Sequence, residues 1–364
     1  MTFRPFENDI MIKLENVFTS WEGAEKFSGI ISMVDNSGIQ FEKVQGYRNR
    51  AEKLPNNRDT AFATASGTKL FTAAAVCKLI DQSKLSIDSK ICDILQYDLK
   101  SIDRETTILN LLTHTSGIAG CFDYDTAEEA DEYYRKHPSH LMLKNEDYLP
   151  LFIDEPAEFR RGERMGYSNS NFILLALVIE AITKTEFADF IKENIFDPLG
   201  MERTGFYALN DLPANTAIGY YYDQRKTQLF ANYYCIPIIG AGDGGIYTTA
   251  DDLKLFWQGL FGCKLFSKDT LEQMIAPRFA DIEGHIGLGV FVSEENGERY
   301  YWHDGYDNGV NFGTAYFPKS QGVLVIMANV NIPIDTIGKI QDEVIATICA
   351  SATKSISLVS SLPT

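Results

Sequence analysis

The order of strand-like and helix-like patterns along the 364 residues most constrains how this chain can fold. Residues 28–48 alternate apolar and polar side chains around the turn sequence Asp35-Asn-Ser-Gly38, which predicts a β-hairpin. Comparable strand patterns return only towards the other end, at 285–292, 300–303, 312–317 and 322–328. Helical patterns and loops fill the chain between. This order predicts an α+β protein in which both ends of the chain build one antiparallel sheet around an inserted helical unit.

Apolar residues recur at helical spacing in several segments, and most clearly at 68–81. Residues 171–183 are apolar on nearly every side, which predicts a helix buried in the core. Residues 127–136 are charged and aromatic, and we expect a helix that faces solvent. The other expected helices are one that ends at 113 and three more at 186–195, 251–261 and 335–350.

The tetrapeptide Ser66-Gly-Thr-Lys69 stands where turn-like sequence becomes an apolar helix. Residues three apart on a helix share a face, so the Ser66 hydroxyl and the Lys69 amine can meet. A serine hydroxyl becomes a good nucleophile when an adjacent base takes its proton. About one S-x-x-K is expected by chance in a chain of this length, and a second copy occurs at Ser351–Lys354.

Two further motifs could complete a serine–lysine site, Tyr167-Ser-Asn169 and His303-Asp304-Gly305. A tyrosine can relay a proton, and an asparagine can hold an amide by hydrogen bonds. A glycine in a strand lets the backbone approach a substrate closely, and a histidine adds a donor or a proton carrier. Each motif also recurs elsewhere in the chain, and each fits an ordinary core tyrosine or strand histidine equally well.

The net charge of −17 argues against nucleic acid and anionic membrane surfaces as partners. Six dispersed cysteines form no C-x-x-C pair and are interpreted as reduced thiols. The one close histidine pair, His137 and His140, has no cysteine or carboxylate pattern to complete a metal site. We therefore expect no metal and no other cofactor.

The first residues contain no basic segment followed by an apolar run, so no secretory signal is recognised. The longest strongly apolar run, 172–179, is too short to span a bilayer. We therefore expect a cytoplasmic protein without a membrane span, or an exported one if a leader has been removed.

Taken in order, these motifs make the chain resemble the serine β-lactamase-like superfamily, which includes class C β-lactamases, D-alanyl-D-alanine carboxypeptidases and related esterases. Its members carry S-x-x-K, then Y-x-N about a hundred residues on, then K-T-G or H-x-G nearer the C-terminus. Here 101 residues separate Ser66 from Tyr167, and 136 separate Tyr167 from His303. Three longer stretches are also similar to the family: 111–117, 195–206 and 240–253.

The resemblance implies a β-lactamase/transpeptidase-like fold. Its sheet domain would comprise residues 1–95 and 235–364, its helical domain residues 96–234, and the active site would lie in the cleft between them. Ser66 would be the nucleophile that becomes acylated, and Lys69 and Tyr167 would handle its proton. Asn169 would hold the substrate's acyl-side amide.

The third motif would supply His303 and Gly305 to the substrate site, and the backbone N–H groups of Tyr306 and Ser66 would form the oxyanion hole. In β-lactamases this motif is usually K-T-G, whose cation and hydroxyl help to bind the substrate's carboxylate. Here Asp304 takes the hydroxyl position and is a specificity candidate, because a carboxylate facing the cleft would repel an anionic substrate. Alternatively, Asp304 points to the other face of the sheet.

These features favour a serine hydrolase that acts through an acyl-enzyme on a small ester, amide, peptide or β-lactam. Within that class, a carboxypeptidase-like or esterase-like enzyme is favoured over an efficient β-lactamase. One alternative is a true class C-like β-lactamase. Another, from a different class, is a catalytically silent binding protein on the same fold.

Overall fold

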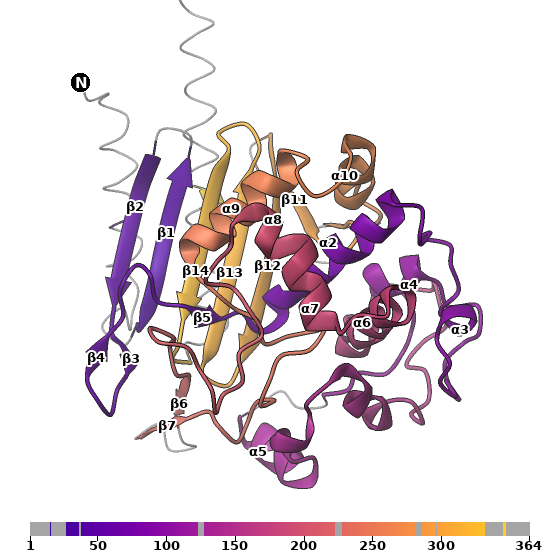
Figure 1. Ribbon diagram of the computed structural model, residues 1–364, viewed down its shortest axis with the longest axis horizontal. Helices are drawn as coiled ribbons and strands as arrows, with labels where there is room; N and C mark the ends of the chain where they lie inside the picture. Colours follow the sequence, from indigo (N-terminus) through magenta and orange to yellow (C-terminus); the bar gives the residue numbers. More distant parts are fainter. Residues whose placement is uncertain are drawn as a thin grey trace, which may run out of the picture.

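The computed structural model describes Glu15 and residues 27–35, 38–122, 127–222, 228–280, 285–295, 297–331 and 345–346. Its centre is an eight-stranded antiparallel sheet in the order β2-β1-β14-β13-β12-β11-β10-β9 (Figure 1). The strands are β1 (Gly29–Asp35), β2 (Gly38–Gln45), β9 (Phe279–Ala280), β10 (His285–Ile286), β11 (Phe291–Glu295), β12 (Glu298–Asp307), β13 (Val310–Phe317) and β14 (Gly322–Ala328).

Both ends of the described chain meet in this sheet. β1 lies between β2 and β14, and its register with β14 runs from Gly29 opposite Ala328 to Val34 opposite Val323. The sequence-based prediction of an antiparallel sheet built from both ends is therefore confirmed. Figure 1 shows the indigo hairpin beside the yellow strands, with most of the magenta helical segment to one side.

Helices occupy the middle of the chain and the connection back to the sheet. They are α2 (Thr68–Asp81), α3 (Ile91–Ile94), α4 (Ile108–Leu112), α5 (Ala127–Lys136), α6 (Asn169–Thr183), α7 (Phe187–Ile191), α8 (Asp197–Leu199), α9 (Ala250–Phe261) and α10 (Lys268–Ile275). Short helical turns are η2 (Ala65–Gly67), η3 (Ser139–Leu141), η4 (Asn145–Leu151) and η5 (Lys192–Phe196).

The sheet buries side chains on both faces. On one face, Trp257 of α9 donates a hydrogen bond to Thr314 Oγ1 of β13 at 2.9 Å and stacks on Tyr316. That face continues into the large core formed with α2 and α6, which are almost wholly buried. The other face has a smaller apolar cluster that includes Ile31, Ile326 and Ile345.

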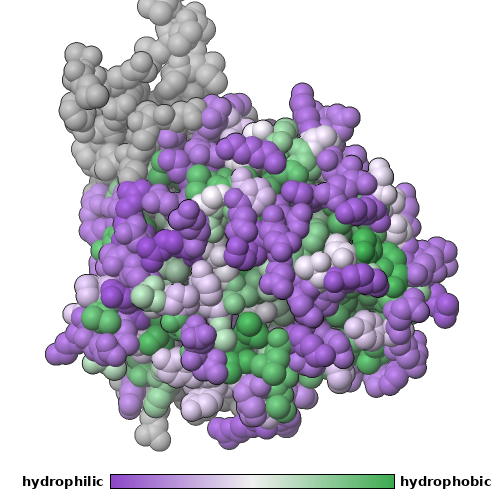
Figure 2. Space-filling view, viewed as in Figure 1, coloured by the Kyte–Doolittle hydropathy of each residue, from purple (hydrophilic) through white to green (hydrophobic). Residues whose placement is uncertain are grey.

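Three small two-stranded ribbons border the sheet: β3 (Tyr47–Asn49) with β4 (Leu54–Pro55), β5 (Phe62–Ala63) with β8 (Tyr247–Thr248), and β6 (Tyr220–Tyr222) with β7 (Leu229–Ala231). The β5–β8 ribbon matters most for the site, because it joins the segment before Ser66 to the glycine-rich loop 240–245. Figure 2 shows that this view of the surface is largely hydrophilic, with hydrophobic side chains gathered towards its lower part.

Several predicted elements need correction. The strand expected at 285–292 is interrupted at 287–290, where Gly289 adopts a φ of +70°. The helix expected to end at 195 continues through a wider turn to Leu199. The solvent-facing helix expected at 127–136 is present as α5, which exposes Glu129, Glu132, Arg135 and Lys136 and buries Ala130 and Tyr134. Helix α10 was not predicted.

Two predictions fall mainly outside the described residues. In the turn expected at 35–38, residues 36 and 37 lie outside the described part of the chain. Of the helix expected at 335–350, only residues 345 and 346 are described, and both are helical. Within the described part of the chain, five cysteines are free thiols, as expected. No helix in that part is long and apolar enough to cross a membrane.

Candidate active site

Ser66 lies in the short turn η2 at the start of helix α2. The preceding residue, Ala65, has a φ of +43°, a left-handed conformation that is uncommon for a residue with a side chain. The turn is held by hydrogen bonds from Thr64 N to Ile246 O at 2.9 Å and from Gly67 N to Thr64 O at 2.8 Å. The serine therefore stands on a sharply bent backbone fixed to the β5–β8 ribbon.

Lys69 lies one helical turn further on and is fully buried. Its ammonium donates to Ser66 Oγ at 3.0 Å, to Asn169 Oδ1 at 2.7 Å and to the backbone carbonyl of Asp243 at 2.6 Å. All three of its donor positions are thus used. The lysine joins the ends of helices α2 and α6 to the glycine-rich loop.

Tyr167 approaches the serine from the other side. Its hydroxyl donates to Ser66 Oγ at 2.7 Å, and the Lys69 ammonium lies 5.0 Å from the centre of its ring. The Tyr167 side chain is 45% exposed, so this side of the serine is open to solvent. Ser66 Oγ therefore lies between two groups that can exchange protons with it.

His114 fixes the backbone that carries Tyr167. It is buried, stacks on the Tyr167 ring with centroids 4.5 Å apart, and its Nδ1 accepts a hydrogen bond from Ser168 N at 3.2 Å. Because Ser168 N–H is the donor, His114 Nδ1 must be unprotonated. Burial, together with the charge of Lys69, lowers the pKa of His114 well below its ordinary value and keeps the ring neutral.

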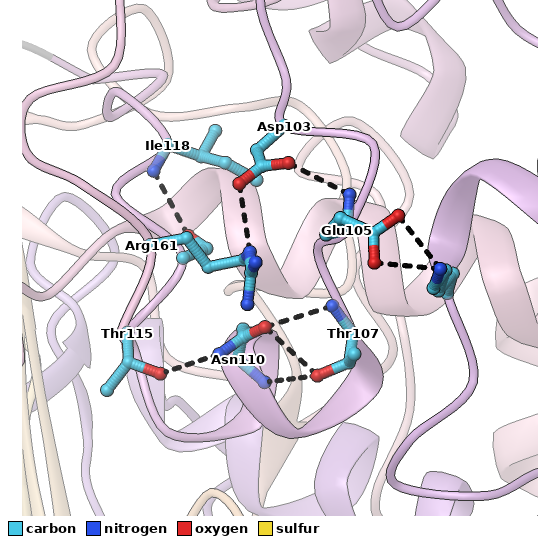
Figure 3. A network of polar contacts seen from close by, with 9 residues as sticks. Asp103, Glu105, Thr107, Asn110, Thr115, Ile118 and Arg161 are labelled. Atoms are coloured by element: carbon cyan, nitrogen blue, oxygen red, sulfur yellow. Dashed lines mark hydrogen bonds and ion pairs between the residues drawn. The ribbon is translucent and has the colours of Figure 1, made fainter. Parts of the chain in front are cut away.

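A polar network behind the site holds the turn that carries His114 (Figure 3). Asn110 Nδ2 donates to Thr115 Oγ1 at 3.2 Å, and the Asn110 and Thr107 side chains cap helix α4 reciprocally. Arg161 binds Asp103 at 2.9 Å and so ties the segment before Tyr167 to the same region. The network thereby fixes both neighbours of the tyrosine, the His114 turn and the 160–166 segment.

The strand β12 passes the serine at very short range. A Cβ atom placed on Gly305 would lie 2.2 Å from Thr64 O and 2.8 Å from Ser66 N, so no side chain fits there. β11 pairs with β12 only as far as Trp302, so no strand of the described part of the chain lies beside residues 303–307 on that side. This unpaired strand edge lies directly beside the serine.

His303 points to the same side of β12 as Gly305 and is buried. Its Nδ1 lies 2.7 Å from the backbone oxygen of Asp304. Burial lowers the pKa of His303 to about 3, so the ring is neutral at ordinary pH. It can offer a neutral donor or acceptor to its surroundings but no cation.

Asp304 lies on the opposite face of the strand from His303 and Gly305 and is exposed. Tyr306 shares that face, is 42% exposed, and its hydroxyl accepts a hydrogen bond from Asn331 Nδ2 at 2.7 Å. By the same alternation, Asp307 is on the face of His303 and Gly305. The acid on the side of the serine is thus Asp307, and Asp304 remains a specificity candidate on prediction alone.

The structure therefore brings together Ser66, Lys69, Tyr167, Asn169 and the His303–Gly305 strand, as the sequence analysis expected of one site. Their catalytic and binding roles stay predictions.

Sequence reasoning did not identify His114, Asp243 or Asp307 as site residues. His114 lies in the stretch 111–117, which was already noted as similar to the family. The contact of Lys69 with Asp243 uses a backbone oxygen, and a pattern of side chains cannot predict such a contact. Among the described residues, no group of three His, Cys, Asp or Glu could hold a metal ion.

Comparison with known proteins identifies the family of this chain. The family model described as Beta-lactamase matches residues 22–342. The putative penicillin-binding protein PbpX of Bacillus subtilis is 28% identical over 304 residues, which cover 84% of this chain and 71% of that protein.

Among solved structures, a penicillin binding protein from Bacillus halodurans is 34% identical with a TM-score of 0.81, covering 90% of this chain and 98% of the other. The D-amino acid amidase of Ochrobactrum anthropi shares the fold, with a TM-score of 0.76 at 18% identity over 96% and 100% of the two chains. The family model spans most of the sequence, and the chain therefore belongs to the beta-lactamase family.

Proposed function

We propose that the protein is a serine hydrolase in which Ser66 attacks a carbonyl carbon and forms an acyl-enzyme. The observation that carries this proposal is the convergence of Lys69 Nζ and Tyr167 Oη on Ser66 Oγ, at 3.0 and 2.7 Å. A hydroxyl held between two proton carriers, on a bent backbone at the start of a helix, has the geometry of an activated nucleophile.

In the first half-reaction, Lys69 or Tyr167 first gives up the proton that it donates to Ser66 Oγ in the resting protein. The bond from Ser66 Oγ to the carbonyl carbon then forms as the serine proton passes to that deprotonated group. The bond to the leaving group then breaks, and the leaving atom receives a proton from the same pair. Water repeats the sequence on the acyl-enzyme and releases the acid. Microscopic reversibility assigns the same two residues to both halves.

We further propose that the backbone N–H groups of Ser66 and Tyr306 form the oxyanion hole, each supplying roughly 3 kcal/mol to the transition state. The close approach of Gly305 to Ser66 N supports this assignment. Asn169 would hold the acyl-side amide through its Nδ2, because its Oδ1 is engaged by Lys69. The cleft would lie between a sheet domain of residues 1–95 and 235–364 and a helical domain of 96–234.

Within this class, we favour an esterase-like, amidase-like or carboxypeptidase-like enzyme over a β-lactamase. The neutral His303 supports this choice, since it offers no cation to the carboxylate of a β-lactam. The alternatives are a class C-like β-lactamase and a protein that binds ligands without turnover. The names of the Bacillus proteins refer to penicillin binding.

The test is covalent labelling with a fluorophosphonate and with a labelled penicillin, read by intact mass and followed over time. We expect one fluorophosphonate adduct on the native protein and none on Ser66→Ala. A chromogenic short-chain ester should be hydrolysed faster than a chromogenic cephalosporin. An adduct that persists in Ser66→Ala would overturn the nucleophile assignment, and rapid cephalosporin turnover without esterase activity would reverse the preferred order.

A further inference from the structure

The glycine-rich loop supplies one of the three acceptors of the Lys69 ammonium as a backbone oxygen, that of Asp243, at 2.6 Å. A backbone oxygen is aimed by the peptide groups beside it. Both peptide groups of Gly242 are held by side chains: its N–H donates to Asn145 Oδ1 at 2.9 Å, and its C=O accepts from Thr72 Oγ1 at 2.7 Å. Asn145 and Thr72 therefore fix the backbone that directly precedes Asp243.

The loop has no room to move towards helix α6. A Cβ atom on Gly242 would press on the backbone oxygen of Phe172 and lie 2.6 Å from Ala176 Cβ. On the far side of Asp243, Ile246 N donates to Thr68 Oγ1 at 3.0 Å. The carbonyl of Asp243 is thus aimed from both sides.

Glu180 determines which way the Asn145 side-chain amide faces. Asn145 Nδ2 donates to Glu180 Oε1 at 3.2 Å, and the same oxygen accepts from Phe187 N at 3.1 Å. An ionised carboxylate can only accept, so Asn145 must turn its NH₂ group to Glu180 and its oxygen to Gly242 N. Asn145 is buried, and the Asn145–Gly242 hydrogen bond is therefore shielded from water.

The alignment of Lys69 with the serine depends on this arrangement. An ammonium has three N–H bonds at fixed angles, so the one aimed at Ser66 Oγ keeps its direction while Asn169 Oδ1 and the Asp243 oxygen hold the other two. Lys69 is fully buried, and the loss of an acceptor there is costly. A displaced Asp243 carbonyl would therefore turn the Lys69 amine away from Ser66.

We propose that Asn145 is a positioning residue for proton transfer between Lys69 and Ser66, and that it acts through the Gly242 peptide and the Asp243 carbonyl. The proposal rests on the proposed function, in which Lys69 exchanges a proton with the serine. The Asn145 side chain bonds to Gly242 and Glu180 rather than to Ser66 or Lys69. Its loss should therefore slow the chemical step and leave substrate affinity nearly unchanged.

The experiment compares the native protein with Asn145→Leu, which has a side chain of similar size but no acceptor. Stopped-flow acylation by a chromogenic short-chain ester gives the limiting rate constant and the half-saturating ester concentration. Fluorophosphonate labelling gives a second rate constant for attack by Ser66. We expect both rate constants to fall about tenfold or more, and the half-saturating concentration to change less than about threefold. Thr72→Val, which removes the other bond to Gly242, should slow both reactions in the same way.

A double variant tests the direction of the hydrogen bonds. Asn145→Asp alone places a second carboxylate against Glu180 and should slow acylation and lower stability. Adding Glu180→Gln gives that carboxylate an amide donor and leaves it free to accept from Gly242 N. We expect this pair of changes to restore acylation to within about threefold of the native rate.

Thr183→Val is the matched control for Thr72→Val, because the Thr183 hydroxyl also donates to a backbone oxygen, that of Ile179 at 2.8 Å, at the opposite end of α6. It should leave acylation unchanged, and thermal unfolding identifies any variant that does not fold.

Native rates in folded Asn145→Leu would overturn the proposal. If that variant does not fold, native rates in Thr72→Val, or a double variant that regains stability without regaining acylation, would overturn it. In each case, labelling of Ser66 in the native protein would still support the hydrolase. Absence of native labelling and turnover would reject the proposed function and this inference together.

Discussion

The imidazole of His114 lies stacked on the phenol ring of Tyr167, with ring centroids 4.5 Å apart. The same imidazole accepts a hydrogen bond from the backbone N–H of Ser168 and faces the side-chain amide of Asn171. One buried ring thus contacts the tyrosine, the backbone directly after it and the first turn of helix α6. We infer that His114 is a positioning residue, which sets where the Tyr167 hydroxyl meets Ser66.

Replacing His114 by Phe should therefore lower kcat. The variant keeps an aromatic ring against Tyr167 but leaves the buried Ser168 N–H without its acceptor, at a cost of roughly 1–3 kcal/mol in stability. A small displacement of the Tyr167 hydroxyl should lower kcat about tenfold or more with little change in KM. Steady-state kinetics and urea unfolding measure the two effects. Unchanged kcat in a destabilised variant would reduce His114 to a purely structural role.

Removing only the Tyr167 hydroxyl should separate positioning from proton transfer. Tyr167→Phe keeps the ring on His114 and under the Lys69 ammonium, so the free energy of unfolding should change little. Acylation by a chromogenic ester should slow by about 10²–10⁴-fold, because a positioned acid or base is lost. Tyr234→Phe is the matched control, since Tyr234 is 85% exposed. Nearly native acylation by Tyr167→Phe would transfer the whole proton-handling role to Lys69.

Gly305→Ala should damage the site through the backbone. The new Cβ would lie 2.2 Å from Thr64 O and 2.8 Å from Ser66 N, so β12 and the serine turn must separate. We expect kcat/KM to fall at least 10²-fold, as when an oxyanion donor is lost, and stability to fall by about 1–3 kcal/mol. Gly120→Ala serves as control, because its nearest neighbour would be 3.6 Å away. Native-like kinetics of Gly305→Ala would argue against the Ser66–Tyr306 oxyanion hole.

Much of this site could be predicted because local patterns specified its parts. The apolar spacing at 68–81 gave helix α2 its observed bounds, and the serine–lysine spacing placed both side chains on one helical turn. The glycine at 305 predicts a strand that can pass close to a substrate, and in the structure Gly305 passes close to the backbone of Thr64 and Ser66. Helical spacing therefore related Ser66 to Lys69, whereas Tyr167, Asn169 and His303 were assigned to the site by the resemblance to the family.

Features that depend on long-range contacts could not be predicted in this way. Helix α10 is held at its start by Asp81, which accepts hydrogen bonds from Ser267 and Thr270 across 186 and 189 residues. The break before β11 depends on Gly289 in an otherwise apolar run.

The neutral state of His303 predicts a specific pH dependence of stability. Burial lowers the pKa of His303 to about 3, whereas an unfolded histidine has a pKa near about 6.5. Between pH 6.5 and pH 3, the imidazole of His303 is protonated in the unfolded chain but not in the folded protein. The free energy of unfolding that is present above about pH 6.5 is therefore lost progressively as the pH falls towards about 3.

His303→Gln should lack this loss. Lowering the pH from 7 to 5 should reduce the free energy of unfolding of the native protein by about 2 kcal/mol more than that of the variant. Urea unfolding at both values measures it, and His140→Gln, at an exposed position, should show no such shift. An unchanged difference for His303→Gln would mean that the ring is protonated in the folded protein.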